Sequence, residues 1–320
     1  MKIVMLDTIT FGDDIDLSKF DAIGEVVKYS TSTQEEAVSR LKDHNPDIVV
    51  NNKIILNKEV LSAAPAIKMI AETATGFNNI DLEYTRAKGI QVANVAGYST
   101  QSVIQHTFAL MFYVLEKLNY YDNYVKSGEY TDCPCFTHFA KVFPEIYGKT
   151  WGIVGLGAIG RGVADVAKAF GCRVVYYSAS GRSYDTEYER VSLDELLSGS
   201  DIISIHAPLN DKTENLFNYE NISKMKKSAI LLNLGRGPVV NDADLARALE
   251  EGLIAGAGLD VIKREPMEKD SPLLKIQDSG KLIVTPHIAW ATYEARSRLM
   301  DEVYENIRAF LRGEKRNVIE

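Results

Sequence analysis

The sequence predicts an α/β protein with two doubly wound parallel-sheet domains, the second inserted into the first. Two observations carry this prediction. Short β-branched apolar runs alternate with segments of helical periodicity, a pattern typical of parallel sheets covered by helices on both faces. A second alternating series begins after a long helical pattern near residue 100, and a chain of 320 residues is long enough for two cores.

The first series opens at the N-terminus. Its predicted strands are 2–6, 25–29, 47–51, 67–72 and 90–95, and its predicted helices are 33–44, 57–64 and 81–89. Thr33 and Glu36 have the spacing of a capping box, and Asn57 is a predicted N-cap. The helical pattern over 98–118, with Ser99 or Thr100 as its cap, is expected to carry the chain into the second domain.

The second series contains a further set of strands and one long helix before the chain returns. The predicted strands are 151–154, 173–178, 201–208, 229–235, 255–261 and 281–287, and the predicted helix is 158–171. An amphipathic helix over about 292–312 then packs back on another element. We therefore expect one domain over 1–98 and 291–320, and the inserted domain over 99–290.

Composition excludes several classes of protein. A formal net charge of −8 argues against a nucleic-acid or anionic-membrane surface. The N-terminus reads neither as a signal peptide nor as a membrane span, and the longest apolar run, 108–115, is too short to cross a bilayer. Three cysteines suit a reducing cytoplasm, and Cys133 and Cys135 have no second pair at zinc spacing, so no metal is expected.

A glycine motif carries the first chemical signal. Gly155, Gly157 and Gly160 form G-x-G-x-x-G between a predicted strand and the helix that opens at Ala158, which is the context this motif requires. The first glycine permits a tight turn, the second lets the backbone approach a pyrophosphate, and the third lets the helix lie close to the strand. The inserted domain is therefore predicted to be a dinucleotide-binding Rossmann domain.

The end of the next strand bears on the choice of nucleotide. Domains specific for NAD commonly place a carboxylate there for the ribose hydroxyls, and this chain has Ser178 instead. With Ser178, Ser180 and Arg182 available as donors to a 2′-phosphate, we predict a preference for NADP(H), with NAD as the alternative.

Three ionisable residues follow later strands of the same domain. Arg236 comes after the strand 229–235, Asp260 and Glu265 come after the next, and His287 follows the last. Because the carboxyl ends of parallel strands meet at one edge, these groups are expected to converge there. Singly, each has a simpler interpretation: a hydrogen-bonded loop histidine, a capping arginine, a solvated acid.

Together these groups suit hydride transfer to a carbonyl. The oxygen that gains negative charge needs a proton donor, and His287 can supply one with Glu265 orienting its ring. The planar fork of Arg236 matches a substrate carboxylate and polarises the adjacent carbonyl.

The sequence resembles the D-isomer-specific 2-hydroxyacid dehydrogenase family over nearly its whole length. Matching stretches occur in family order at 73–81, 94–110, 155–164, 206–213, 233–237, 258–266 and 286–290. The resemblance implies a flavodoxin-like substrate domain around the Rossmann insert, catalytic roles for Arg236, Glu265 and His287, and a homodimer. The glycerate dehydrogenase and hydroxypyruvate or glyoxylate reductase branch is the most similar, so a small 2-oxo or 2-hydroxy acid is the expected substrate.

The resemblance also implies binding residues. The substrate carboxylate would be held by the backbone around Thr75 and Gly76, with Arg236 and His287. The implied cofactor contacts are Gly155, Gly157, Ala158, Ile159, Gly160, Ser178, Ser180, Arg182, His206, Ala207, Pro208, Thr213, Leu234, Gly235, Arg236, Asp260 and His287.

Other functions remain open on these residues. Formate dehydrogenases share the architecture but pair the histidine with glutamine, so Glu265 counts against them. A nucleotide-sensing corepressor of the same fold would bind protein partners, although this acidic chain has no obvious appended interaction tail. A methyltransferase would leave Arg236, Glu265 and His287 without a role.

Overall fold

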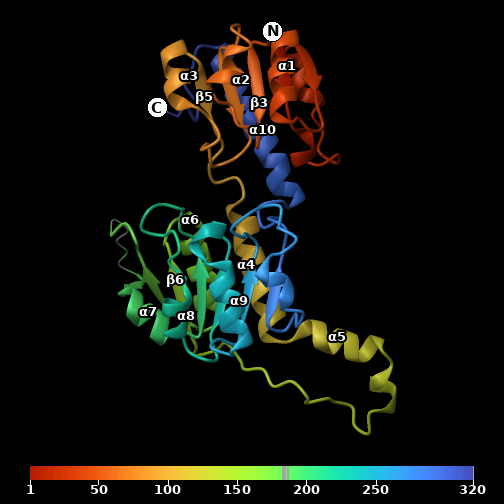
Figure 1. Cartoon of the computed structure of the whole chain (residues 1–320), viewed down its shortest axis with the longest axis vertical. Coiled ribbons are helices and arrows are strands. Elements are labelled where there is room, and N and C mark those ends of the chain that lie inside the picture. The colour runs from red at the N-terminus through yellow and green to blue at the C-terminus, as the bar shows by residue number, and fades with distance from the viewer. Residues whose placement is uncertain (182–184, 186, 320) are drawn as a thin grey trace. The chain divides into compact units, whose positions relative to one another are not determined.

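Two parallel sheets organise the chain, each within its own unit (Figure 1). The computed structural model describes residues 1–181, 185 and 187–319. Unit 1 comprises Met1–Ser99 and Ala291–Glu320, and unit 2 comprises Thr100–Trp290. The division falls one residue later than the expected boundary, at the point where the helix α4 begins.

Unit 1 contains a five-stranded sheet in the order β2-β1-β3-β4-β5, with all pairs parallel. The strands are β1 (Lys2–Met5), β2 (Glu25–Lys28), β3 (Ile48–Asn51), β4 (Met69–Glu72) and β5 (Gln91–Ala93). The helices are α1 (Gln34–His44), α2 (Lys58–Ser62), α3 (Leu82–Lys88) and α10 (Tyr293–Leu311). This is the flavodoxin-like strand order expected for the outer domain.

Unit 2 contains a seven-stranded parallel sheet in the order β12-β11-β10-β9-β6-β7-β8. The strands are β6 (Thr150–Val154), β7 (Arg173–Tyr177), β8 (Glu189–Arg190), β9 (Ile202–Ile205), β10 (Ile230–Asn233), β11 (Gly256–Leu259) and β12 (Leu282–Val284). The helices are α4 (Thr100–Leu115), α5 (Leu118–Lys126), α6 (Ala158–Ala169), α7 (Leu193–Gly199), α8 (Tyr219–Ser223) and α9 (Asp242–Glu250). The chain runs outward from β6 to β8, returns to β9 beside β6, and continues to β12, which is the Rossmann order with one added strand.

Local signals in the sequence set several helix ends. The capping box of Thr33 and Glu36 is formed at the start of α1, and the Asn57 side chain accepts from Val60 N at the start of α2. The last helix starts one residue later than expected because Thr292 is its N-cap and accepts from Ala295 N. It ends one residue earlier than expected, with Arg312 as its C-cap. Capping side chains satisfy backbone amides that lack an intrahelical partner.

Apolar side chains cover both faces of the larger sheet. One core cluster combines sheet residues with α4 and α6, and it includes Phe108 and the fully buried Trp151. A second cluster combines the other face with α7, α8 and α9. Strands buried on both faces are mostly apolar, and β9 and β10 are fully buried with a single polar residue each.

An arm formed by residues 118–147 projects from the rest of unit 2 (Figure 1). It contains α5 and an irregular return segment, joined by the stacked rings of Tyr124 and His138 at a centroid distance of 3.8 Å. Among the described residues, no helix combines the length and apolar content needed to cross a membrane.

Candidate active site

The turn after β6 has the geometry that the glycine motif predicts. Gly155 has φ +91°, and a Cβ there would lie 2.9 Å from the backbone of Ala207. At Gly160 a Cβ would lie 2.2 Å from the Gly155 carbonyl oxygen, so α6 packs directly on the turn. A Cβ at Gly157 would meet no atom within 4 Å. The turn therefore leaves open space at its middle glycine, where a pyrophosphate needs to approach the backbone.

This turn lies at the topological switch point of the sheet. It follows β6, and His206 follows the neighbouring strand β9. Both ring nitrogens of His206 are buried and have no hydrogen-bond partner among the described residues. Burial lowers the pKa of His206 to about 3, so the ring is neutral and keeps an unused donor and acceptor. The free helix amides at Ala158 and Ile159 and this unused ring fit a dinucleotide.

The loops after β10 and β11 bring Arg236 beside the Glu265 segment. A Cβ at Gly237 would lie 1.7 Å from the carbonyl oxygen of Ile262, so only glycine allows this close approach of the two loops. The Asn233 side chain fixes the β10 loop by donating to the Arg236 carbonyl oxygen at 3.0 Å. The Arg236 side chain is exposed, and its Nη1 donates to the Gly235 carbonyl oxygen at 2.9 Å.

His287 and Glu265 form a direct pair. His287 Nδ1 lies 2.7 Å from Glu265 Oε2, and about a third of each side chain is exposed. The Glu265 Oε1 atom also accepts from Ile262 N at 3.2 Å. Because the carboxylate accepts at Nδ1, the proton of that nitrogen is fixed and Nε2 is left for other partners. This is the orientation that a proton-donating histidine needs.

Asp260 organises the loop that carries His287. It is 2% exposed, and its Oδ1 and Oδ2 atoms accept from Ile288 N and Ala289 N, each at 2.8 Å. Its carbonyl oxygen accepts from His287 N at 2.9 Å. His287 itself has φ +55°, a left-handed conformation that is uncommon for a residue with a side chain.

These residues share one pocket. Arg236, Glu265 and His287 line a pocket of about 180 Å³, together with Gly237, Pro238, Val261, Ile262 and Lys263. All of them belong to unit 2, so the convergence does not depend on the other unit.

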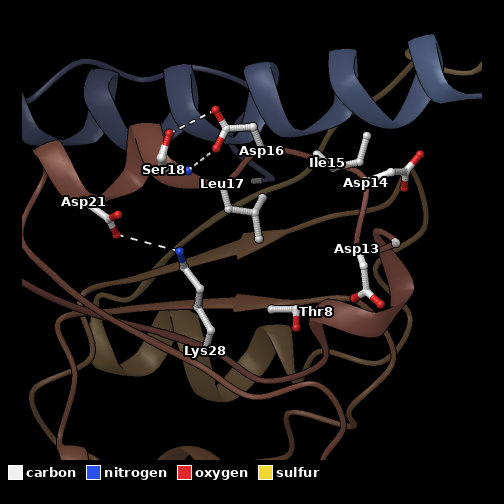
Figure 2. A pocket seen from close by; sticks show the side chains of 10 residues that line it. Thr8, Asp13, Asp14, Ile15, Asp16, Leu17, Ser18, Asp21 and Lys28 are labelled. Carbon is white, nitrogen blue, oxygen red and sulfur yellow. Dashed lines mark hydrogen bonds and ion pairs between the residues drawn. The ribbon is translucent and has the colours of Figure 1, made fainter.

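A larger pocket, of about 540 Å³, lies in unit 1 between residues 8 and 28 (Figure 2). Its aspartates are largely engaged. Asp16 accepts from the Ser18 amide at 2.8 Å, and Asp21 lies 3.8 Å from Lys28 Nζ. Size alone would favour this pocket, but it holds no residue of the predicted site.

The remaining predicted binding residues lie in several places. Thr75 and Gly76 belong to unit 1, in the loop after β4, where Thr75 Oγ1 donates to the Val95 carbonyl oxygen at 3.0 Å. Thr213 is buried and closes the loop after β9 through its bond to the Pro208 carbonyl oxygen at 2.7 Å. Leu234 and Gly235 follow β10 as expected.

The predicted 2′-phosphate site is described only in part. Ser178 is buried at the end of β7, with its Oγ atom 3.4 Å from Ser180 Oγ. Arg182 lies outside the described residues. Cys133 donates to the Thr137 carbonyl oxygen and Cys135 is exposed, both in the arm.

Sequence reasoning did not find two side chains that contact the His287 loop. Ser102 Oγ donates to the Ala289 carbonyl oxygen at 2.5 Å, and His106 Nε2 lies 3.0 Å from Thr285 Oγ1. Both come from α4, far away in the chain, so no local pattern could have linked them to the loop.

The sheet of unit 2 has a phosphate-binding turn at its switch point and a histidine–carboxylate pair further along the same edge. These two features define the class of protein. The protein is a dinucleotide-dependent oxidoreductase.

Comparisons with known proteins identify the family. The model of the D-isomer specific 2-hydroxyacid dehydrogenase NAD binding domain matches residues 108–289. A hydroxypyruvate reductase from Blautia hydrogenotrophica is 40% identical over 327 residues, covering 100% of this chain and 99% of the relative. The chain therefore belongs to the D-isomer-specific 2-hydroxyacid dehydrogenase family, as its motifs predict. It is an NAD(P)-dependent enzyme that interconverts a small D-2-hydroxy acid and its 2-oxo acid.

Two solved structures are similar over nearly the whole chain. An acyclic imino acid reductase (Bsp5) in complex with NADPH and D-Arg has a TM-score of 0.87 and 31% identity. The match covers 100% of this chain and 100% of the reductase. A D-lactate dehydrogenase from Aquifex aeolicus, complexed with NAD and lactic acid, has a TM-score of 0.83 and 29% identity, with coverages of 98% and 96%. These comparisons support the dehydrogenase prediction rather than the corepressor alternative.

Proposed function

We propose that the protein reduces a short 2-oxo acid of the hydroxypyruvate and glyoxylate class to the D-2-hydroxy acid, with His287 as the proton donor. The observation that carries this proposal is the contact between His287 Nδ1 and Glu265 Oε2 in the pocket that Arg236 also lines. The hydroxypyruvate reductase at 40% identity supports the substrate class.

The residues of this chain supply the polar part of the reaction. Arg236 binds the substrate carboxylate through two parallel hydrogen bonds and draws electron density from the adjacent carbonyl. The reduced nicotinamide, when bound, supplies a hydride to the carbonyl carbon. His287 gives the proton on Nε2 to the carbonyl oxygen, so a hydroxyl group forms and the ring becomes neutral. Glu265 keeps Nδ1 protonated throughout and balances the charge of the imidazolium.

Backbone groups would hold the two anionic parts of the ligands. The turn at Gly155, Gly157 and Gly160, with the first amides of α6, would hold the pyrophosphate. Thr75 and Gly76 would bind the substrate carboxylate through their amides, by the family resemblance. In the oxidation direction the same groups act in reverse, with neutral His287 as the base.

NADP(H) is proposed as the preferred nucleotide. Ser178 occupies the end of β7, where a carboxylate would repel a 2′-phosphate, and Ser180 Oγ lies within 3.4 Å of it. The similar imino acid reductase was solved with NADPH, whereas the D-lactate dehydrogenase was solved with NAD. A Ser178→Asp variant should shift kcat/KM toward NADH, and an unchanged ratio of the two nucleotides would contradict the proposal.

A homodimer is proposed, with the arm as its interface. Phe136, Phe139 and Val142 lie within one short stretch of the arm and are each more than 80% exposed, and large exposed apolar side chains gathered in one segment favour an interaction surface. The paired substitution Phe139→Ser and Val142→Ser should yield a monomer by light scattering. Ile9→Ser, at a residue of unit 1 that is 58% exposed, is the matched control and should leave the mass unchanged. A monomeric wild-type protein would reject this interface.

A cytoplasmic location is also proposed, on the small number of cysteines, all of which are free.

One assay tests the proposed reaction. Oxidation of NADPH and NADH is followed by absorbance with hydroxypyruvate, glyoxylate and pyruvate as substrates. We expect the highest kcat/KM with NADPH and one of the first two acids. Absence of turnover with all three acids and both nucleotides would reject the proposed substrate class.

A further inference from the structure

One helix holds both ends of the loop that carries His287. Ser102 and His106 are four residues apart in α4, so they lie on the same face of the helix. Ser102 Oγ donates to the carbonyl oxygen of Ala289 at 2.5 Å, at the far end of the loop. His106 Nε2 lies 3.0 Å from Thr285 Oγ1 at the near end.

The hydrogen bonds at the near end have a defined direction. Thr285 Oγ1 donates to Asp260 Oδ1 at 2.6 Å, so the same oxygen accepts from His106 Nε2. Burial lowers the pKa of His106, against a smaller opposing effect of Asp260, whose Oδ1 lies 3.5 Å from His106 Nε2. A chain of donors therefore runs from α4 to the Asp260 carboxylate, and each bond polarises the next.

Asp260 connects these hydrogen bonds to the loop of His287. Its two carboxylate oxygens accept from the amides of Ile288 and Ala289, and its carbonyl oxygen accepts from His287 N. His287 has φ +55°, and such backbone conformations persist only where surrounding contacts enforce them. Asp260 holds the middle of this loop, and the two α4 side chains hold its ends at Thr285 and Ala289.

We propose that Ser102 and His106 are positioning residues that clamp the His287 loop, so that the imidazole stays where Glu265 and the substrate can use it. The inference rests on the proposed role of His287 as proton donor. Neither side chain lines the pocket, so their effect passes through Asp260, Thr285 and the loop backbone.

Kinetics of four variants test the clamp. His106→Leu and Ser102→Ala should each lower kcat by about 10- to 100-fold, the loss typical of a slightly misplaced catalytic group, with the KM for NADPH unchanged. His106→Gln should recover most of the activity, because its amide nitrogen can donate to Thr285 as Nε2 does. Thr107→Val is the matched control: Thr107 is buried in the same helix, and its hydroxyl donates to the Val103 carbonyl oxygen within that helix.

Hydrogen exchange gives a readout that needs no turnover. Amides of the loop 285–289 should exchange faster in His106→Leu and Ser102→Ala than in wild type or Thr107→Val, whereas the amides of β9 should not change. Unchanged loop exchange, or an equal loss of kcat in Thr107→Val, would overturn the clamp. If wild-type protein turns over no 2-oxo acid yet the loop exchanges faster in both variants, the proposed function fails and the clamp stands.

Discussion

At the scale of single residues, the pair of His287 and Glu265 determines what the pocket can do. The carboxylate occupies Nδ1, so Nε2 alone is left to exchange a proton with substrate. His287→Ala should therefore reduce kcat by about 10²–10⁴-fold, the usual contribution of a general acid. Nucleotide affinity, measured by fluorescence titration, should be nearly unchanged because the glycine turn is intact. Retained turnover would remove His287 from the mechanism.

Arg236 should not tolerate lysine. A lysine keeps the positive charge but cannot form two parallel bonds to a carboxylate. We expect kcat/KM for the 2-oxo acid to fall about 10- to 100-fold in Arg236→Lys, the range for hydrogen bonds to charged groups. Steady-state kinetics at saturating NADPH measure this loss, and nucleotide binding serves as the control. A variant with near-normal KM and kcat would place the substrate carboxylate elsewhere.

Residues of the site differ in how far the sequence could predict them. Arg236, Glu265 and His287 follow strands within recognisable motifs, and parallel strands bring such positions to one edge. Ser102 and His106 contact the same loop across 187 and 179 positions of chain, and such a pairing depends on how α4 packs on the sheet. No spacing rule encodes that packing.

At the scale of elements, periodicity and capping residues predicted all the helices of unit 1 but missed several short helices of unit 2. The strands of unit 1 and the helices α1, α2, α3, α4, α6 and α10 were predicted within a few residues. Helices α7, α8 and α9 were not named, although Ser192 and Glu195 form a capping box at the start of α7. These three helices have five to nine residues and so show few turns, and the two residues of β8 show no pattern. The equally short α2 was predicted because Asn57 marks its start.

The β6–α6 turn gives a contrast between two glycines. Gly157→Ala should leave Tm unchanged but weaken NADPH binding, because the added methyl group enters open space where the pyrophosphate would lie. Gly160→Ala should lower Tm, because the methyl group would lie 2.2 Å from the Gly155 carbonyl oxygen. Thermal unfolding and a nucleotide titration measure the two effects. Equal losses of Tm in both variants would contradict the separate roles.

At the scale of the whole molecule, we expect the ionisation of Glu72 to make the free energy of unfolding depend on pH. This side chain is fully buried at the end of β4 and accepts from the amides of Asn51 and Asn79. Burial raises its pKa from 4.5 to about 8, opposed by those two hydrogen bonds. The folded chain thus binds a proton that the unfolded chain releases.

The proton bound by Glu72 makes the free energy of unfolding depend on pH. The contribution of Glu72 is complete below pH 4.5 and is lost as the pH rises to about 8, because ionisation then places a charge in the buried site near Asp7. In urea unfolding, wild type should lose stability relative to Glu72→Gln as the pH rises through this range, because the glutamine side chain stays neutral. A difference that stays constant with pH would mean that Glu72 is ionised in the folded protein.

The bond between Ser102 and Ala289 has a further consequence for how this chain is assembled. It joins the first turn of unit 2 to Ala289, the second-last residue of that unit, so the two ends of the inserted unit lie close together. A domain that receives an insert with adjacent ends has to span only a short gap between its own two attachment points. An insert of this kind can be transferred as a unit to another domain while the sheet of each domain stays unchanged.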